Sequence, residues 1–180
     1  MSETLTAVTG TPATGKTTFS QKLAPRIGAE VIDLKEVVTE NKLYEFRDEE
    51  EDALVVEPSV LDSFLKKTIK VQGKSIIYDG LLSHLVEVDQ IIVLRCNPKI
   101  LLQRYRERGY SSTKIRENLE AEYVGVVLEQ SLATGKPVLE VDNSCKLNLE
   151  NIVQWLSKPE TKESSVDYTS EFEEIINQGF

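Results

Sequence analysis

Short apolar runs alternate with helical patterns along this chain of 180 residues. Five runs rich in valine and isoleucine predict strands at Leu5–Thr9, Glu30–Asp33, Ser75–Asp79, Gln90–Arg95 and Pro137–Val141. They lack a strict apolar–polar alternation, which is typical of strands covered on both faces. Strands that alternate with helices indicate a parallel sheet with helices on both sides. We therefore predict a three-layer α/β fold around a five-stranded parallel sheet.

Helix signals fill the stretches between these strands. Proline at the start and glycine at the end of an apolar periodic segment are typical helix boundaries. These signals predict helices over residues 17–23, 58–71, 97–109, 112–133, 148–156 and 166–177. We expect residues 1–158 to form the main domain and residues 159–180 to form a linker and a helix with Phe172, Ile175 and Ile176 on one side. Two interpretations stay open for this last helix, packing on the core or binding a partner.

The residues Gly10–Thr17 fit the pattern G-x-x-x-x-G-K-[ST] between the first predicted strand and the first predicted helix. Glycines let the backbone turn tightly, so that successive N–H groups point into one concavity. The N-terminus of the helix adds its free N–H groups and the positive end of its dipole. Lys16 would reach the outer phosphates of a nucleotide, and the Thr17 hydroxyl would bind Mg²⁺. The pattern favours a P-loop NTPase fold over a Gly-rich turn with an incidental lysine. We call residues Gly10–Thr17 the phosphate loop.

Composition excludes several classes of function. The chain carries 21 basic and 30 acidic residues, a net charge of −9, whereas a surface that follows nucleic-acid phosphates is normally basic. Two cysteines and one histidine exclude a dense disulfide framework and a self-contained zinc site, and they indicate a reducing compartment, cytoplasmic or nuclear. No apolar run approaches about 18 residues and no secretory signal is evident, so we expect no membrane association. The acidic balance is compatible with a basic protein partner or with solubility alone.

Carboxylates at strand ends are the candidate metal ligands. Asp79 ends an apolar run at the edge of the sheet where the phosphate loop begins. A carboxylate in this place is the usual second Mg²⁺ anchor, often acting through water, and the alternative is a cap for the following turn. Asp33 and Asp89 also lie at strand ends, and Asp33 would polarise a substrate hydroxyl or a metal-bound water.

Three arginines, Arg104, Arg106 and Arg108, precede a turn at Gly109. Guanidinium groups stabilise the negative charge that spreads over a transferring phosphoryl group. Arg104 and Arg108 are four residues apart and share one helix face, while Arg106 points elsewhere. We predict that Arg108 enters the site when a mobile segment closes, which also expels water. A solvated helix face is the alternative.

The connection over residues 34–57 is long for a compact domain, and such connections often form binding lids. Tyr44 and Phe46 would stack a base, and Arg47 or Lys35 would bind a monophosphate. The acidic run Asp48–Asp52 is expected to face solvent or a basic partner.

Two further polar residues follow strands. Asn143 comes after the last predicted strand, where it would face the edge of an adenine. His84 is the sole histidine, and we expect it to make a structural hydrogen bond rather than to act in catalysis.

Five segments occur together in one order: Thr9–Thr18, Leu43–Tyr44 with Asp48–Glu50, Ile91–Arg95, Arg108–Tyr110 and Lys114–Glu122. In this order and spacing they resemble the isoenzyme-six branch of the adenylate kinases, a small nuclear and archaeal type also described as a coilin-interacting nuclear ATPase. The resemblance covers residues 4–157. It implies the reaction ATP + AMP ⇌ 2 ADP with Mg²⁺, and an ATPase activity linked to maturation of the small ribosomal subunit.

The resemblance also implies a nucleotide-monophosphate segment over residues 33–57 and a short lid over residues 107–117. It implies contacts with ATP for Ala13, Gly15, Lys16, Thr17, Thr18 and Arg108. Ala13 stands where the family commonly has glycine, so its contact would come from the backbone N–H alone. Leu81 stands where the family often has histidine, which weighs against efficient hydrolysis.

Together these observations predict a monomeric, Mg²⁺-dependent kinase that transfers the γ-phosphoryl group of ATP to AMP or a related nucleoside monophosphate. Lys16 and Arg108 would be catalytic, and Thr17 and Asp79 would hold the metal. ATP would be bound by Gly10, Ala13, Thr14, Gly15, Lys16, Thr17, Thr18, Arg108 and Asn143, and the acceptor by Asp33, Tyr44 and Arg47. The alternative is an ATP-switched assembly factor that docks and releases a basic small-subunit ribosomal protein.

Overall fold

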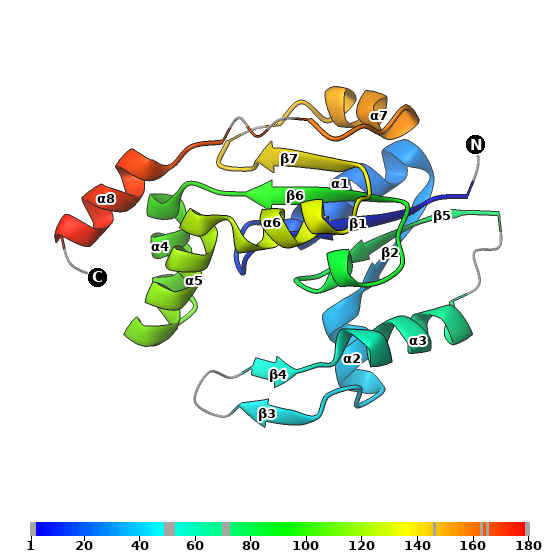
Figure 1. Ribbon diagram of the computed structural model, residues 1–180, viewed down its shortest axis with the longest axis horizontal. Coiled ribbons are helices and arrows are strands. Elements are labelled where there is room, and N and C mark those ends of the chain that lie inside the picture. Colours follow the sequence, from blue (N-terminus) through cyan, green and yellow to red (C-terminus); the bar gives the residue numbers. More distant parts are fainter. Residues whose placement is uncertain are drawn as a thin grey trace.

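The computed structural model describes residues 3–48, 53–69, 73–145, 147–162, 164 and 166–178. A five-stranded parallel sheet forms its centre, with the strand order β2–β5–β1–β6–β7 (Figure 1). These strands are β1 (Leu5–Thr9), β2 (Ala29–Asp33), β5 (Ser75–Asp79), β6 (Gln90–Arg95) and β7 (Val138–Asp142). All five predicted strands are confirmed within one residue of their ends.

Helices cover both faces and the carboxyl end of this sheet. They are α1 (Lys16–Ile27), α2 (Leu34–Glu40), α3 (Pro58–Thr68), α4 (Pro98–Glu107), α5 (Ser112–Val124), α6 (Val126–Ala133), α7 (Leu149–Ser157) and α8 (Thr169–Gln178), with a short 3₁₀ turn, η1, at Ser83–Leu85. The predicted starts of α3, α4, α5 and α7 are confirmed within one residue, and at each of them a side chain accepts a hydrogen bond from a free N–H group of the first turn. At α4, for example, Asn97 accepts a hydrogen bond from the backbone N–H of Lys99 at 3.0 Å.

Side chains of alternate parity along the strands build two apolar layers. Val8 and Ile92 face α1 and α7, where they pack with Phe19. Ala7 and Ile91 face the opposite layer, which includes α2, α3 and α6. Burial on both faces explains why these strands show continuous apolar runs instead of alternation.

A third apolar cluster lies at the carboxyl end of the sheet, where α4, α5 and α8 meet (Figure 1). It includes Leu101 of α4, Leu119 of α5 and Phe172 of α8, together with Ala13 of the phosphate loop. The C-terminal helix therefore packs on the core, which confirms the first of the two interpretations left open by the sequence. Of its predicted apolar side, Phe172 is buried, whereas Ile176 is 44% exposed and lies outside the cluster. Helical geometry places Phe172 and Ile175 toward α4 and α5, and it turns Ile176 a further 100° or so away.

The single helix predicted over residues 112–133 is wrong, because the chain forms two helices that meet at Gly125. Gly125 adopts φ = 68°, in the left-handed region that glycine tolerates best. Its N–H donates to the carbonyl groups of Ala121 and Glu122, which ends α5 before α6 begins. Gly125, which interrupts a long helical pattern of apolar residues in the sequence, is therefore the end of a helix.

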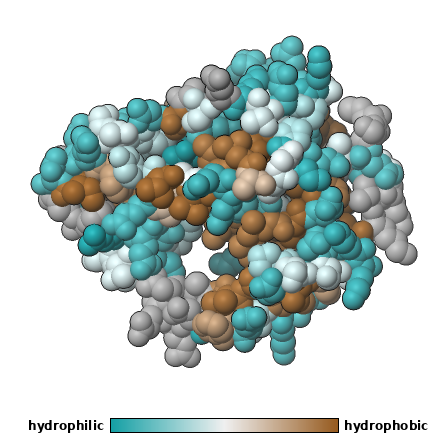
Figure 2. Space-filling model, in the orientation of Figure 1, coloured by the Kyte–Doolittle hydropathy of each residue, from teal (hydrophilic) through white to brown (hydrophobic). Residues whose placement is uncertain are grey.

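A two-stranded antiparallel pair, β3 (Phe46–Asp48) and β4 (Ala53–Val55), lies beside α2 in the long connection after β2 (Figure 1). Figure 2 shows apolar side chains gathered on this face of the molecule, around a hollow in its lower half. Residues 49–52, most of the predicted acidic run, lie outside the described residues. None of the helices in the described ranges combines the length and the apolar character that a membrane crossing demands.

Candidate active site

The phosphate loop joins the end of β1 to the start of α1 at the carboxyl edge of the sheet. Gly10 has φ = 140°, and a Cβ atom there would lie 2.4 Å from the carbonyl oxygen of Leu94. Gly15 has φ = 93°, and a Cβ atom there would lie 2.6 Å from the Asn143 amide nitrogen. Both glycines are thus required by backbone conformation and by close neighbours.

Side chains from outside the loop bind its carbonyl oxygens. The Arg104 guanidinium donates to the Ala13 carbonyl at 2.7 Å, and the Tyr105 hydroxyl donates to the Pro12 carbonyl at 2.8 Å. The Asn143 amide donates to the Thr14 carbonyl at 2.7 Å. These contacts hold the loop in a fixed path, and they give Asn143 a loop contact that the sequence did not predict.

Free N–H groups gather where α1 begins. The first helical hydrogen bond runs from the Phe19 N–H to the Gly15 carbonyl at 3.0 Å. The first turn of a helix leaves its earliest N–H groups without helical partners, here those of Lys16, Thr17 and Thr18. Together with the helix dipole they form a site that suits an anion such as phosphate.

Lys16 folds back over the loop. Its ammonium donates to the carbonyl oxygens of Gly10 at 2.8 Å and Thr11 at 2.9 Å. Burial lowers the pKa of Lys16 to about 8, because desolvation outweighs the attraction of the Asp79 carboxylate. The lysine is thus a cation held at some electrostatic cost in a place where bound phosphates would stabilise it.

Asp79 ends β5 directly beside β1, with Val8 as its partner in the register. Its side chain is buried, and one carboxylate oxygen has no hydrogen-bond partner. Burial raises the pKa of Asp79, while the neighbouring Thr17 hydroxyl and the Lys16 ammonium oppose that rise. A buried carboxylate oxygen without a partner is unfavourable in the free protein and is open to a cation or to a cation-bound water.

These groups fit a magnesium ion that shares its ligands with a nucleotide. Among the described residues, no group of three or more histidine, cysteine, aspartate or glutamate side chains could hold a metal ion by itself. Mg²⁺ is usually bound by one or two protein ligands, with water and substrate phosphates completing its shell. The Thr17 hydroxyl and the Asp79 carboxylate supply a ligand set of that size.

The three predicted arginines, Arg104, Arg106 and Arg108, lie in different surroundings. Arg104 contacts the loop, as described above, and Arg106 is exposed. Arg108 ends α4 with an exposed side chain, close enough to Lys16 to lower the lysine pKa. Arg104 therefore contacts the phosphate loop, and Arg108 lies near Lys16 without a hydrogen bond of its own to the loop in the described residues.

The predicted acceptor residues lie at the end of β2 and in the connection that follows it. The Asp33 carboxylate caps α2 by accepting from the N–H groups of Lys35 at 2.8 Å and Glu36 at 3.2 Å. Asp33 is also the register partner of Asp79, so the two carboxylates end neighbouring strands. Tyr44 is exposed in the loop after α2, and Arg47 is exposed in β3.

His84 is buried at 2% exposure, as expected of a structural histidine. Its Nδ1 lies 2.9 Å from the Thr9 hydroxyl, and its Nε2 lies 3.0 Å from the Gln130 amide oxygen. Burial lowers the pKa of His84, which favours the neutral ring. Leu81, by contrast, is 43% exposed after β5.

Sequence reasoning missed the polar groups that support the loop from behind. The Thr11 hydroxyl donates to the Glu122 carboxylate, which also binds Arg95. The only signal in the sequence was a charged residue at 122 on the same helix face as Ile115 and Leu119. Buried charges of this kind require partners, but the pattern does not say which.

The phosphate loop with its Lys16 and Thr17, together with a carboxylate on the neighbouring strand of a parallel sheet, defines a P-loop NTPase fold. The same architecture occurs in deoxyadenosine kinase from M. mycoides with bound dATP, at a TM-score of 0.55 and 18% identity, covering 87% of this chain and 100% of that one. Shikimate kinase from Bacteroides thetaiotaomicron gives a TM-score of 0.52 at 17% identity, covering 86% of this chain and 97% of that one. At these identities the likeness shows the fold alone.

Relatives of higher sequence identity show to which family within the P-loop NTPase fold the chain belongs. A family model described as an AAA domain matches residues 7–125. A Methanocaldococcus jannaschii protein named "Putative adenylate kinase" is 41% identical over 170 residues, covering 92% of this chain and 93% of its own length. A Pyrococcus furiosus protein of the same name is 41% identical over 174 residues, covering 94% of each chain. The chain belongs to this adenylate-kinase-like family.

Proposed function

We propose that the protein is a Mg²⁺-dependent nucleoside monophosphate kinase that transfers the γ-phosphoryl group of ATP to AMP or a related monophosphate. The observation that carries the proposal is the buried Asp79 oxygen without a partner, next to Thr17 and Lys16. A structural cap would use that oxygen inside the protein, whereas a nucleotide-bound cation would take it from outside.

The roles of the loop residues follow from their contacts. The free N–H groups at the start of α1 bind the phosphates of ATP, and Lys16 leaves part of its contact with the loop carbonyls to bind the outer phosphates. When bound, Mg²⁺ supplies positive charge to the β- and γ-phosphate oxygens, held by Thr17 and, directly or through water, by Asp79. Ala13 and Thr14 belong to the ATP-binding backbone, with Asn143 supporting Thr14 from outside.

Closure of a short lid over residues 107–117 would bring the Arg108 guanidinium onto the transferring group. Phosphoryl transfer needs no covalent intermediate, because positioning and electrostatic stabilisation supply most of the rate. Arg108 starts from an exposed position near Lys16, which suits a group that approaches only when substrates are bound. Closing also removes water that would compete with the acceptor.

The acceptor would lie under α2 and the β3–β4 pair, within residues 33–57. Asp33 faces this side of the sheet edge next to Asp79, Tyr44 would stack the base, and Arg47 would bind the monophosphate. The proposal of the isoenzyme-six type within the family, and of a monomer, rests on the sequence motifs alone.

An acceptor panel tests the kinase proposal. Coupled assays with MgATP and AMP, dAMP, CMP or no acceptor should show ADP formation that rises strongly with at least one monophosphate. ADP formation equal to the ATP-only rate with every acceptor would refute the kinase and leave an ATPase. Substitution Lys16→Ala provides the blank, since it removes the cation that contacts the phosphates.

A binding experiment separates the kinase from an ATP-switched assembly factor. Leu81 and the buried His84 leave no histidine facing the phosphates from the end of β5, which favours transfer to an acceptor over hydrolysis. A switch would instead show tight binding of a basic ribosomal protein in one nucleotide state and weak binding in the other. Binding that ignores the nucleotide would count against the switch.

A further inference from the structure

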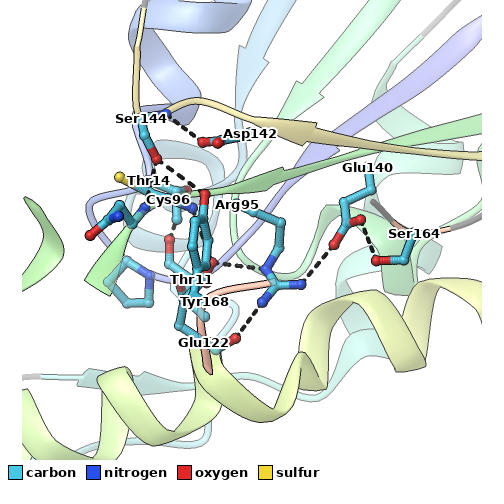
Figure 3. A network of polar contacts seen from close by, with 12 residues as sticks. Thr11, Thr14, Arg95, Cys96, Glu122, Glu140, Asp142, Ser144, Ser164 and Tyr168 are labelled. Atoms are coloured by element: carbon cyan, nitrogen blue, oxygen red, sulfur yellow. Dashed lines mark hydrogen bonds and ion pairs between the residues drawn. The ribbon is translucent and has the colours of Figure 1, made fainter. Parts of the chain in front are cut away.

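A buried network of polar side chains contacts the phosphate loop at Thr11 (Figure 3). Its centre is Arg95, the last residue of β6, which is only 6% exposed. The guanidinium donates to Glu122 of α5 at 2.8 Å and to Glu140 of β7 at 2.7 Å. The ring of Tyr168, from the segment before α8, covers it with its centroid 6.0 Å away.

The two carboxylates are matched in charge and burial. The Glu122 side chain is 1% exposed and the Glu140 side chain 4% exposed. Burial alone would lower the pKa of Arg95, but the two carboxylates outweigh it and raise the pKa. Each glutamate therefore compensates the same buried cation.

Only one of the two reaches the phosphate loop. Glu140 uses its other oxygen to accept from the Ser164 hydroxyl at 2.6 Å, in the C-terminal segment. Glu122 accepts from the Thr11 hydroxyl with one oxygen and from the Cys96 N–H at 3.0 Å with the other. Glu122 thus connects the sheet edge and α5 directly to the loop.

Thr11 in turn contacts Lys16. Its carbonyl oxygen accepts from the Lys16 ammonium at 2.9 Å and from the Thr14 hydroxyl at 2.9 Å. Fixing the Thr11 side chain therefore fixes the carbonyl on which Lys16 rests. A hydrogen bond to a buried carboxylate is stronger than one between neutral groups, so the position is well defined.

We propose that Glu122 is a positioning residue for phosphate binding, which acts through the Thr11 hydroxyl to hold the loop and Lys16 ready for ATP. The proposal rests on the proposed function of the loop as the ATP site. It goes beyond that function because Glu122 lies in the last turn of α5, outside the proposed lid and the residues assigned to ATP binding. It also assigns a use to a buried charged network that packing alone would not require.

Two matched substitutions test it. Glu122→Gln and Glu140→Gln each remove one buried charge next to Arg95, and only the first replaces the charge-assisted hydrogen bond to Thr11 of the loop with a weaker neutral one. We expect both to lower the unfolding temperature, Glu122→Gln to weaken MgATP binding about tenfold, and Glu140→Gln to change it less than about twofold. Equal effects of the two substitutions on the ATP dissociation constant would overturn the proposal.

A second pair isolates the hydroxyl and covers the case in which Glu122→Gln does not fold. Thr11→Val removes the donor and keeps the shape, and Thr11→Ser keeps the donor. The valine variant should lose about tenfold in ATP affinity and the serine variant should stay close to the wild type. Full ATP affinity in Thr11→Val would refute the role of the hydroxyl.

Hydrogen exchange in the nucleotide-free protein separates this proposal from the proposed function. Amides of residues 10–19 should exchange faster in Glu122→Gln and Thr11→Val, but not in Glu140→Gln. If the wild-type protein did not bind ATP, the ATP site would be refuted, while this exchange pattern would still decide whether Glu122 holds the loop. Unchanged exchange in both loop variants would overturn the positioning role.

Discussion

Proton uptake should accompany ATP binding, because Lys16 has a pKa of about 8 in the nucleotide-free protein. At that pKa roughly nine tenths of the lysines are charged at pH 7 and about one tenth at pH 9. Bound phosphates favour the charged form and raise the pKa toward or beyond the ordinary value of 10.5. Above pH 8 the complex therefore holds a proton that the free protein has lost, so binding weakens as the pH rises.

The size of the effect follows from linkage. If the phosphates restore the pKa to 10.5, ATP affinity falls by up to about tenfold for each pH unit between 8 and 10.5. The uptake per bound ATP should be roughly 0.1 proton at pH 7, 0.5 at pH 8 and 0.9 at pH 9. Below pH 7 the lysine is charged in both states, and this contribution disappears.

Calorimetric titration with MgATP in two buffers of different ionisation enthalpy measures the uptake directly. Lys16→Arg is the control, since a guanidinium keeps its charge throughout this range and should bind without the uptake. An affinity that stays constant from pH 7 to pH 9 in the wild type would refute the reasoning. Equal uptake in Lys16→Arg would assign the proton to another group.

Three further experiments test the site and the packing of α8. Asp79→Asn should weaken ATP binding in the presence of Mg²⁺ but not in its absence. It should preserve or raise the unfolding temperature, because burial already disfavours the charged carboxylate. A drop in stability without a magnesium effect would indicate a structural cap. Arg108→Ala should lower kcat at least about a hundredfold, and Arg106→Ala, an exposed neighbour, should leave it unchanged; similar rates in the two variants would exclude a role for Arg108. Phe172→Ala should cost about 3 kcal/mol in chemical denaturation and Ile176→Ala less than about 0.5 kcal/mol, because only Phe172 is buried against α4 and α5; equal losses would contradict the observed packing of α8.

The sheet was predictable because its three central strands, β1, β5 and β6, are buried on both faces, and such strands carry a dense signal of β-branched residues. The phosphate loop was predictable because the local backbone conformation requires glycine at Gly10 and Gly15, and a short sequence motif is enough to specify those positions. Gly125 shows the limit of the same reasoning. A glycine inside an apolar period is compatible with a continuous helix or with a helix end, and only the packing of α6 on the sheet decides between them.

The network behind the loop was not predictable for a different reason. Arg95 and Glu122 are 27 residues apart, and nothing in their spacing relates one to the other. Their pairing depends on where α5 ends against β6, which is a property of the assembled core. Asn143 is an intermediate case, since its place after the last strand predicted a position at the site, while its contact with the Thr14 carbonyl required the structure.

The anchoring of α4 and α5 to the phosphate loop limits how much of the proposed lid between them would move during a catalytic cycle. Tyr105 ties the end of α4 to the loop, and Glu122 ties the far end of α5 to it. Motion of the proposed lid would thereby be confined to the residues in between, so its closing would order few residues. We expect turnover to depend only weakly on solvent viscosity, in contrast to a kinase that must swing a whole domain before each product leaves.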